Sequence, residues 1–303
     1  MKQLLSLIVI VVLSVSCKPG SPQDKNALPR VVCTTNILAN LVQNLGGDSI
    51  EVTALMGPGV DPHLYKATQG DVQALSQANL IVYNGLHLEG KMIEILENMR
   101  GNKTVEAAHF IDTSLFINSS DFAGAYDPHI WFDPLLWSNV AHGLSNHLQK
   151  RYPNAAGYIR ENERRFQQQL QQLHHYSDSL LGTIPDKQRV LITAHDAFGY
   201  FGRSFDLEVK ALQGISTAAE YGINDVNNLV TFITERRIPA IFIENSVPPR
   251  SIEAVLAACR QKGHDVQLGG ELYSDALGAK NSEAGTYLGM LRHNVETIAK
   301  ALQ

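Results

Sequence analysis

The tripeptide Asp-Pro-His occurs twice in the chain, and each copy is followed by an apolar residue and an aromatic one. The first copy lies in VDPHLY, residues 60–65, and the second lies in YDPHIW, residues 126–131. Proline fixes its own φ and favours an extended conformation for the residue before it, so each tripeptide forms a stiff corner that aims an imidazole. The repetition predicts a shared role for His63 and His129.

Two further side chains that bind transition metals lie where predicted strands end. His195 ends the predicted strand 189–195, and Asp275 lies in the loop after the predicted strand 265–269. His63 also follows a predicted strand. Open α/β sheets bind their ligands at the carboxyl ends of the strands. We therefore expect these side chains to converge.

Three imidazoles and one carboxylate complete the coordination shell of a divalent transition metal. Zn²⁺ takes four nitrogen, oxygen or sulfur ligands in a tetrahedron, and Mn²⁺ accepts the same set if the carboxylate is bidentate. Zn²⁺ binds such ligands more tightly than Mn²⁺. The sequence predicts one site for Zn²⁺, or for Mn²⁺, held by His63, His129, His195 and Asp275.

Carboxylates next to the predicted ligands could orient the histidine rings. Asp61, Asp127 and Asp196 each lie beside a ligand, and a carboxylate bonded to the outer ring nitrogen orients a ligating histidine. The sequence does not show which of them does so. His87, in NGLHLEG, also lies at a strand end and could be mistaken for a ligand, but we do not count it among the metal ligands. We assign to surfaces or packing the remaining histidines, which are His109, His142, His147, His174, His175, His264 and His293.

Strand-like and helix-like segments alternate from Arg30 onward, which favours parallel sheets covered by helices. Residues 134–181 read as almost wholly helical, with a break at Tyr152-Pro153, and the stretch 154–185 is long for a surface helix. We predict an α/β fold of two lobes, each a parallel β-sheet flanked by helices. One long rigid helix joins them, and the metal site lies in the cleft between the lobes.

The chain divides into five predicted segments. They are a signal peptide (1–16), a lipidated tether (17–29), an N-terminal α/β lobe (30–152), a connecting helix (153–184) and a C-terminal α/β lobe (185–303). A rigid connection permits only small movements, so we expect modest closure around the metal.

The first residues have the layout of a secretory signal. Residues 4–15 carry no charge and are too few to span a bilayer as a helix. Cys17 follows Ser16, as in lipoprotein signals, although Ser14 stands where that pattern prefers leucine. We predict that Cys17 is lipidated and anchors the exported protein to a bacterial membrane, facing the periplasm or the cell exterior. The alternative is an ordinary cleaved signal with an incidental cysteine.

Charge and cysteine content exclude two classes of protein. The net charge of −5 argues against a nucleic-acid partner. Cys33 and Cys259 lie at opposite ends of the chain, so we expect two separate buried thiols and no disulfide scaffold.

Long and uncommon strings in residues 30–301 resemble the metal-binding solute-binding proteins of zinc and manganese ABC transporters. They are TTNILANLV, GPGVDPHLYKATQGDV, NGLHLEGKM, DPHIWFDP, TAHDAFGYF, LQGISTAAE, IFIENSV and GGELYSDALG. The chain looks closest to the TroA-like branch, which has histidine as its third ligand where strict manganese binders carry glutamate. The loop 111–126 lacks the histidine-rich insertion of many dedicated zinc importers.

The resemblance implies the ligands His63, His129, His195 and Asp275, two lobes on one long helix, and delivery of the metal to a permease in the inner membrane. It implies no enzymatic activity, and we expect a monomer. Trp131 and Tyr65, after the two corners, are expected to shield the site from water.

Two other functions fit some of the same residues. A zinc-dependent hydrolase would need Asp275 to stand aside for water and a general base such as Glu220 or Glu271, but the sequence has no His-Glu-x-x-His motif. A surface adhesin is the third hypothesis, and no adhesive motif supports it.

Overall fold

The computed structural model describes residues 27–99, 101, 103–119 and 124–303. The predicted signal peptide and Cys17 lie outside the described residues. Within the described part of the chain, no helix combines the length and the apolar character that a membrane crossing requires.

The N-terminal lobe is built on a parallel sheet. Its strands are β1 (Arg30–Cys33), β2 (Glu51–Ala54), β3 (Leu80–Tyr83) and β4 (Thr104–Glu106), in the order β2-β1-β3-β4. Strand β4 was not predicted, because three residues are too few to show an alternating pattern.

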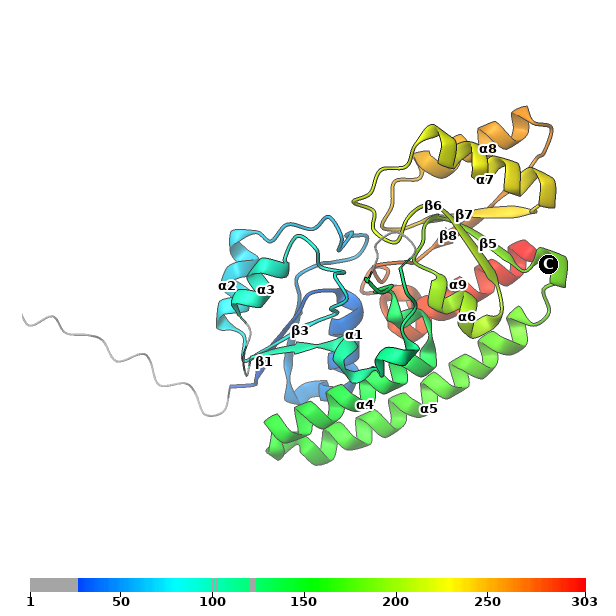
Figure 1. Ribbon diagram of the computed structural model, residues 1–303. Coiled ribbons are helices and arrows are strands. Elements are labelled where there is room, and N and C mark those ends of the chain that lie inside the picture. The colour runs from blue at the N-terminus through cyan, green and yellow to red at the C-terminus, as the bar shows by residue number, and fades with distance from the viewer. Residues whose placement is uncertain (1–26, 100, 102, 120–123) are drawn as a thin grey trace, which may run out of the picture.

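Helices cover both faces of this sheet (Figure 1). They are α1 (Asn36–Gly46), α2 (Gln69–Gln77) and α3 (Ile93–Asn98). Val31 of β1 joins the cluster that includes α1, whereas its neighbour Val32 joins the cluster of α2 and α3. This is the two-residue period of a strand that is buried on both faces.

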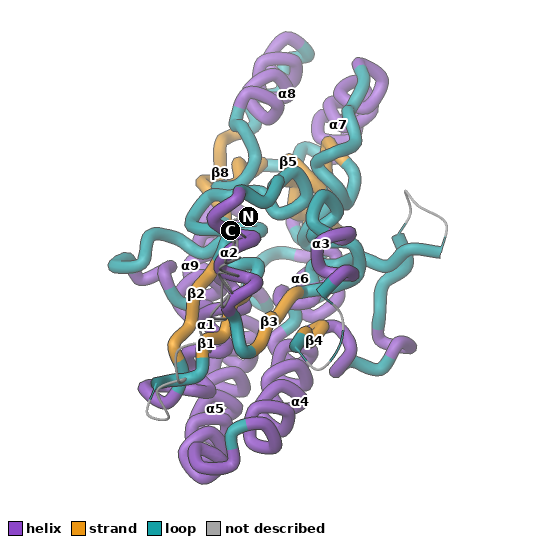
Figure 2. Tube along the Cα trace, turned by 90° about the vertical axis from the view of Figure 1, so that its left-hand side faces the viewer, coloured by secondary structure: helices purple, strands orange, loops and turns teal. Residues whose placement is uncertain are grey.

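Two long helices follow, as the sequence predicted. Helix α4 (Pro134–Arg151) begins at Asp133, whose carboxylate accepts hydrogen bonds from the backbone of the first turn. Helix α5 (Ala156–Leu181) begins after the break at Tyr152-Pro153 and has 26 residues, or about 39 Å. The two helices lie side by side beneath the lobes (Figures 1 and 2).

The C-terminal lobe contains two parallel strand pairs. Strands β5 (Val190–His195) and β6 (Glu208–Gln213) form one pair, and β7 (Ala240–Glu244) and β8 (Gln267–Leu272) form the other. The end of β5 is tied to β7 through a side chain, because the Glu244 carboxylate accepts hydrogen bonds from the backbone N–H groups of Ala194 and His195.

Four helices accompany these strands. Helices α7 (Ile223–Arg236) and α8 (Arg250–Gln261) pack on one side, at the end of the molecule opposite α4 and α5 (Figure 2). Helices α6 (Gly199–Phe205) and α9 (Tyr287–Leu302) belong to the other side. The predicted α/β architecture with a long helix is therefore present.

One hydrophobic core runs through both lobes. Tyr287 of α9 stacks on Trp137 of α4, with ring centroids 5.6 Å apart, and lies edge-on to Phe166 of α5. Helix α5 also bonds to both lobes: Asn162 donates to the carbonyl of Leu45, and Tyr176 donates to Glu296. Both lobes thus pack against helices α4 and α5.

The two described cysteines are separate buried thiols, as predicted. Burial raises the pKa of both, most strongly that of Cys33.

Candidate metal centre

The structure brings together the four side chains that the sequence singled out. His63 lies in the loop after β2, His129 in the corner before α4, His195 at the end of β5 and Asp275 in the loop after β8. Each offers one ligand atom, and these atoms all lie within 4.8 Å of one another. Each residue is at most 4% exposed. The cluster lies between the lobes, with two members from each.

The two Asp-Pro-His corners have the same local geometry. The carboxylate of Asp61 accepts a hydrogen bond from the backbone N–H of His63 at 2.8 Å, and Asp127 does the same for His129 at 2.9 Å. An aspartate that bonds the backbone two residues on closes a tight turn. The repeated aspartate therefore fixes the corner, together with the proline.

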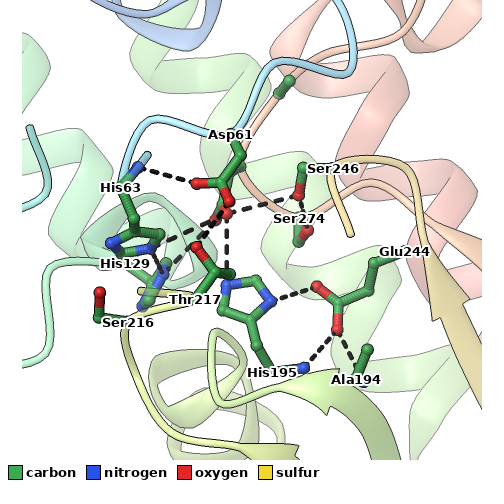
Figure 3. Close-up of polar contacts among 12 residues, drawn as sticks. Asp61, His63, His129, Ala194, His195, Ser216, Thr217, Glu244, Ser246 and Ser274 are labelled. Atoms are coloured by element: carbon green, nitrogen blue, oxygen red, sulfur yellow. Dashed lines mark hydrogen bonds and ion pairs between the residues drawn. The ribbon is translucent and has the colours of Figure 1, made fainter. Parts of the chain in front are cut away.

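Carboxylates orient two of the three rings from outside. Oδ1 of Asp127 lies 2.8 Å from Nδ1 of His129. Oε2 of Glu244 lies 2.6 Å from Nδ1 of His195 (Figure 3). With Nδ1 held in this way, Nε2 of each ring faces the centre of the cluster. Asp61 has a different role, because its second oxygen accepts a hydrogen bond from Thr217 of the other lobe at 2.6 Å.

Glu244 was missed by the sequence reasoning, which considered Asp196 beside His195. Asp196 instead lines a cavity of the C-terminal lobe together with Glu220 and Asp225. The one available signal for Glu244 was its place at the end of the apolar run AIFIE, because the carboxyl end of a strand is where ligands bind.

Some of the distances inside the cluster are close to those of a tetrahedral zinc site. Ligand atoms placed about 2.0–2.1 Å from Zn²⁺ in a tetrahedron lie about 3.3–3.4 Å apart. Nε2 of His63 and Nε2 of His129 are 3.3 Å apart. Oδ1 of Asp275 lies 3.4 Å from Nε2 of His129, and Oδ2 lies 3.3 Å from Nε2 of His195 and 3.9 Å from Nε2 of His63.

Burial and neighbouring charge act differently on the three histidines. Burial lowers the pKa of His63 to about 3. Burial also lowers the pKa of His129, but the carboxylates of Asp127 and Asp275 outweigh it and raise the value to about 9. For His195, Glu244 and Asp275 outweigh burial and raise the pKa well above its usual value.

The carboxylate of Asp275 completes this charge balance. Burial raises its pKa, but the rings of His195 and His129 outweigh burial and hold the pKa well below its usual value. Without metal, these shifts favour protonated rings at His129 and His195, which attract the buried carboxylate of Asp275. A metal ion would replace these protons, because a ligating imidazole is neutral.

The two aromatic residues after the corners differ in their contacts. Trp131 is buried, lies edge-on to His129 with ring centroids 5.3 Å apart, and donates from Nε1 to the carbonyl of Ser274. Tyr65 instead packs on the cluster of α2 and α3 and donates its hydroxyl to Asp71. Trp131 thus covers the centre as expected, whereas Tyr65 serves the packing of its own lobe.

The bases that a hydrolase would need lie outside the cluster. Glu220 and Glu271 are both exposed residues. Glu220 lines the cavity that contains Asp196, in the C-terminal lobe. The cluster itself consists of three histidines and one aspartate, which is the composition of a metal-binding site.

Comparisons with known proteins agree with this geometry. Residues 31–301 match the family described as "Zinc-uptake complex component A periplasmic". The chain is 45% identical over 274 residues to the manganese-binding lipoprotein MntA of Bacillus subtilis, which covers 90% of each protein. It is also 45% identical over 275 residues to the zinc-binding protein TroA of Treponema pallidum, covering 90% of this chain and 89% of that protein.

A solved structure extends the agreement to the fold. The periplasmic zinc-binding protein TroA from Treponema pallidum superposes with a TM-score of 0.89 at 44% identity, covering 91% of this chain and 99% of that one. This confirms the predicted fold class and the predicted resemblance. The chain belongs to the ZnuA family of metal-binding substrate-binding proteins of ABC transporters, a family of transport components and not of enzymes.

Proposed function

We propose that the protein captures Zn²⁺ outside the cytoplasmic membrane and delivers it to the permease of an ABC transporter for uptake. His63, His129, His195 and Asp275 are the ligands in this proposal. Cys17 would carry the lipid anchor, and names of relatives that include the word lipoprotein support such an anchor. We expect a monomer that needs no nucleic-acid partner.

One observation carries the proposal. Four buried side chains from both lobes bring their ligand atoms within 4.8 Å of one another, with two of the rings oriented by Asp127 and Glu244. Four protein ligands that close the shell are typical of zinc sites that do no catalysis.

The preference for zinc over manganese rests on the three imidazoles in this ligand set. Mn²⁺ favours more oxygen ligands and higher coordination numbers, and Zn²⁺ stands above Mn²⁺ in affinity for the same set. The relatives support either metal, since a manganese-binding and a zinc-binding protein are equally similar to the chain. Mn²⁺ is therefore the alternative cargo.

A competition titration tests the function. Residues 21–303 are stripped of metal and titrated with Zn²⁺ and with Mn²⁺ by calorimetry, beside His195→Ala and the exposed-histidine control His175→Ala. We expect one tight Zn²⁺ site that is unchanged in His175→Ala and weakened by about a hundredfold or more in His195→Ala, because losing the partner behind a ligand already costs about 10–100-fold. A lack of stoichiometric binding in the wild type would overturn the proposal, and tighter binding of Mn²⁺ than of Zn²⁺ would change the cargo.

A further inference from the structure

A cavity of about 360 Å³ lies against the proposed metal site on the side of His63. Leu86 and Tyr126 of the N-terminal lobe and Ile215 and Ser216 of the C-terminal lobe contribute to its walls. Of the four proposed ligands, His63 is the one that lines it. An ion that came through this cavity would therefore meet His63 first.

A second imidazole lines the same cavity. His87 follows β3 and is exposed, whereas His63 is buried. Both can bind a divalent metal, because a neutral imidazole offers one ring nitrogen. The lining of the cavity thus includes one exposed imidazole and one buried imidazole.

The backbone holds His87 in an unusual conformation. Gly85, Leu86 and His87 have φ values of 84°, 52° and 64°. Residues other than glycine rarely adopt positive φ, and such strain persists only where the surroundings enforce it, often at functional sites. Here the buried carboxylate of Glu89 accepts hydrogen bonds from the backbone of Asn84 and Gly85, and Leu86 packs against the core.

A neighbouring cavity of about 320 Å³ brings negative charge to the same place. It shares Leu86, His87 and Tyr126 with the first cavity, and it adds Glu97 and Glu106. His87 therefore borders both cavities, with carboxylates on one side and His63 on the other. A cleft lined by one sign of charge raises the local concentration of counter-ions and their rate of association.

His63 is also the ligand best suited to exchange. The rings of His129 and His195 are each held by a carboxylate at Nδ1, whereas Asp61 bonds the backbone of His63 and leaves its ring to other contacts. Among the described residues, no carboxylate holds Nδ1 of His63 in this way, and such a ring can turn away from the metal at a lower cost than the other two.

We propose that His87 is a transient ligand on the access route, which receives the incoming divalent ion and passes it to His63. The inference rests on the proposed function. Each imidazole that binds displaces one water molecule from the hydrated ion, whose charge does not change. Because His87 contacts the ion only in transit, it speeds both arrival and departure and leaves the equilibrium affinity unchanged.

Stopped-flow mixing with Zn²⁺ tests the route, with tryptophan fluorescence as the signal, because Trp131 lies beside His129. The variant is His87→Asn, because asparagine tolerates positive φ and keeps the turn. His175→Ala on α5 is the control, and Glu106→Gln tests the charge at the mouth while it keeps an acceptor for Tyr83. Thermal unfolding checks that each variant is folded, and calorimetry gives the affinity and stoichiometry.

We expect His87→Asn to slow association by about tenfold and to slow dissociation equally, with one Zn²⁺ still bound at unchanged Kd. Glu106→Gln should slow association less, and its effect should disappear at high salt. Unchanged association and dissociation rates in His87→Asn would overturn the proposed route. Weaker binding caused by faster dissociation would also overturn the route, and either result would leave the proposed function in place. A wild-type protein that binds no Zn²⁺ would overturn the proposed function itself.

Discussion

The three imidazoles of the proposed site are held in place by different neighbours. The carboxylates of Asp127 and Glu244 lie beside the outer nitrogens of His129 and His195, while the turn at Asp61 fixes only the backbone of His63. Within the described part of the chain, two ligands are therefore preorganised through their rings and the third through its backbone. Preorganisation lowers the ordering cost of binding.

Glu244→Gln should weaken metal binding by about 10–100-fold, as is usual when a carboxylate behind a ligating histidine is lost. Glutamine can still accept the hydrogen bonds from Ala194 and His195, so the link between β5 and β7 is kept. A competition titration against a chelator of known affinity measures the change.

Asp196→Asn is the matched control, because Asp196 follows His195 directly in the chain but lines a different cavity. We expect its affinity to equal that of the wild type. Equal losses in the two variants would mean that general charge near His195, and not the contact with Glu244, supports binding.

The difference between Asp196 and Glu244 shows where sequence reasoning reaches its limit at this scale. His63, His129, His195 and Asp275 could be picked because ligand-type residues recurred at strand ends and in proline corners. Glu244 is remote from His195 in the chain, and only the packing of β7 beside β5 brings its carboxylate to the ring. Contacts of this kind depend on tertiary structure.

The raised pKa values of His129 and His195 predict how stability depends on pH. A folded pKa of about 9 for His129, above the usual 6.5, adds stability that is complete below pH 6.5 and disappears as the pH rises through 9. We therefore expect the free energy of unfolding of the metal-free protein to fall between pH 6.5 and 9.

Saturating Zn²⁺ should remove this fall, because ligating imidazoles carry no extra proton. Denaturant unfolding at several pH values, with a chelator and with Zn²⁺, measures both curves. A metal-free protein whose stability stays level or rises over this range would contradict the charge arrangement inferred for the centre.

At the scale of elements, the turn between β3 and α3 departs most from the sequence pattern. The apolar residues of LEGKMIEILENMR, residues 88–100, recur at helical spacing, but α3 extends only from Ile93 to Asn98. The preceding residues are held in turns, because the Glu89 side chain bonds the backbone after β3 and the hydroxyl of Thr34 after β1. The hydrogen bonds of the buried Glu89 carboxylate to the ends of β1 and β3 thus outweigh the local preference for a helix.

Glu89→Ala should lower the free energy of unfolding by about 1–3 kcal/mol, because it leaves the buried N–H groups of Asn84 and Gly85 without their acceptor. Glu89→Gln keeps an acceptor and should cost less. Chemical denaturation measures both.

Glu94→Ala serves as the control, since Glu94 is an exposed residue in the first turn of α3. It should change stability by well under 1 kcal/mol. If Glu89→Ala were as mild as Glu94→Ala, the carboxylate would not be what holds the turn.

Longer elements followed the sequence closely. The stretch 154–185 was expected to be one helix, and α5 occupies Ala156–Leu181 with buried residues at helical spacing, among them Ile159, Phe166 and Leu173. Such periodicity persists over many turns and is legible without tertiary information. The division of the chain into signal, tether, lobes and connecting helix stays a prediction.

At the scale of the whole molecule, the lobes are joined unequally on the two sides of the metal centre. On the side of α4 and α5 they share a core, and Tyr287 donates its hydroxyl to the carbonyl of Trp131. On the side of the first corner, the hydrogen bond from Thr217 to Asp61 joins the lobes. The shared core resists large rotation, so release of the metal is expected to need only a small local opening at the first corner.

Thr217→Val should therefore speed metal release. The hydroxyl of Thr217 ties a loop of the C-terminal lobe to the same aspartate that fixes the corner of His63. Losing a hydrogen bond to a charged group costs about 1.5–3 kcal/mol, which corresponds to an increase in the dissociation rate of about tenfold or more if the bond breaks before the metal leaves. Mixing the Zn²⁺-loaded protein with excess chelator in a stopped-flow instrument measures this rate.

Thr234→Val is the matched control, because within the described residues the hydroxyl of Thr234 bonds only carbonyls of its own helix α7. We expect it to release Zn²⁺ at the wild-type rate. If Thr217→Val did the same, the first corner would not be where the lobes part. Opening would then have to strain the core around Trp137 and Tyr287, and release would be slow for every variant that leaves this core intact.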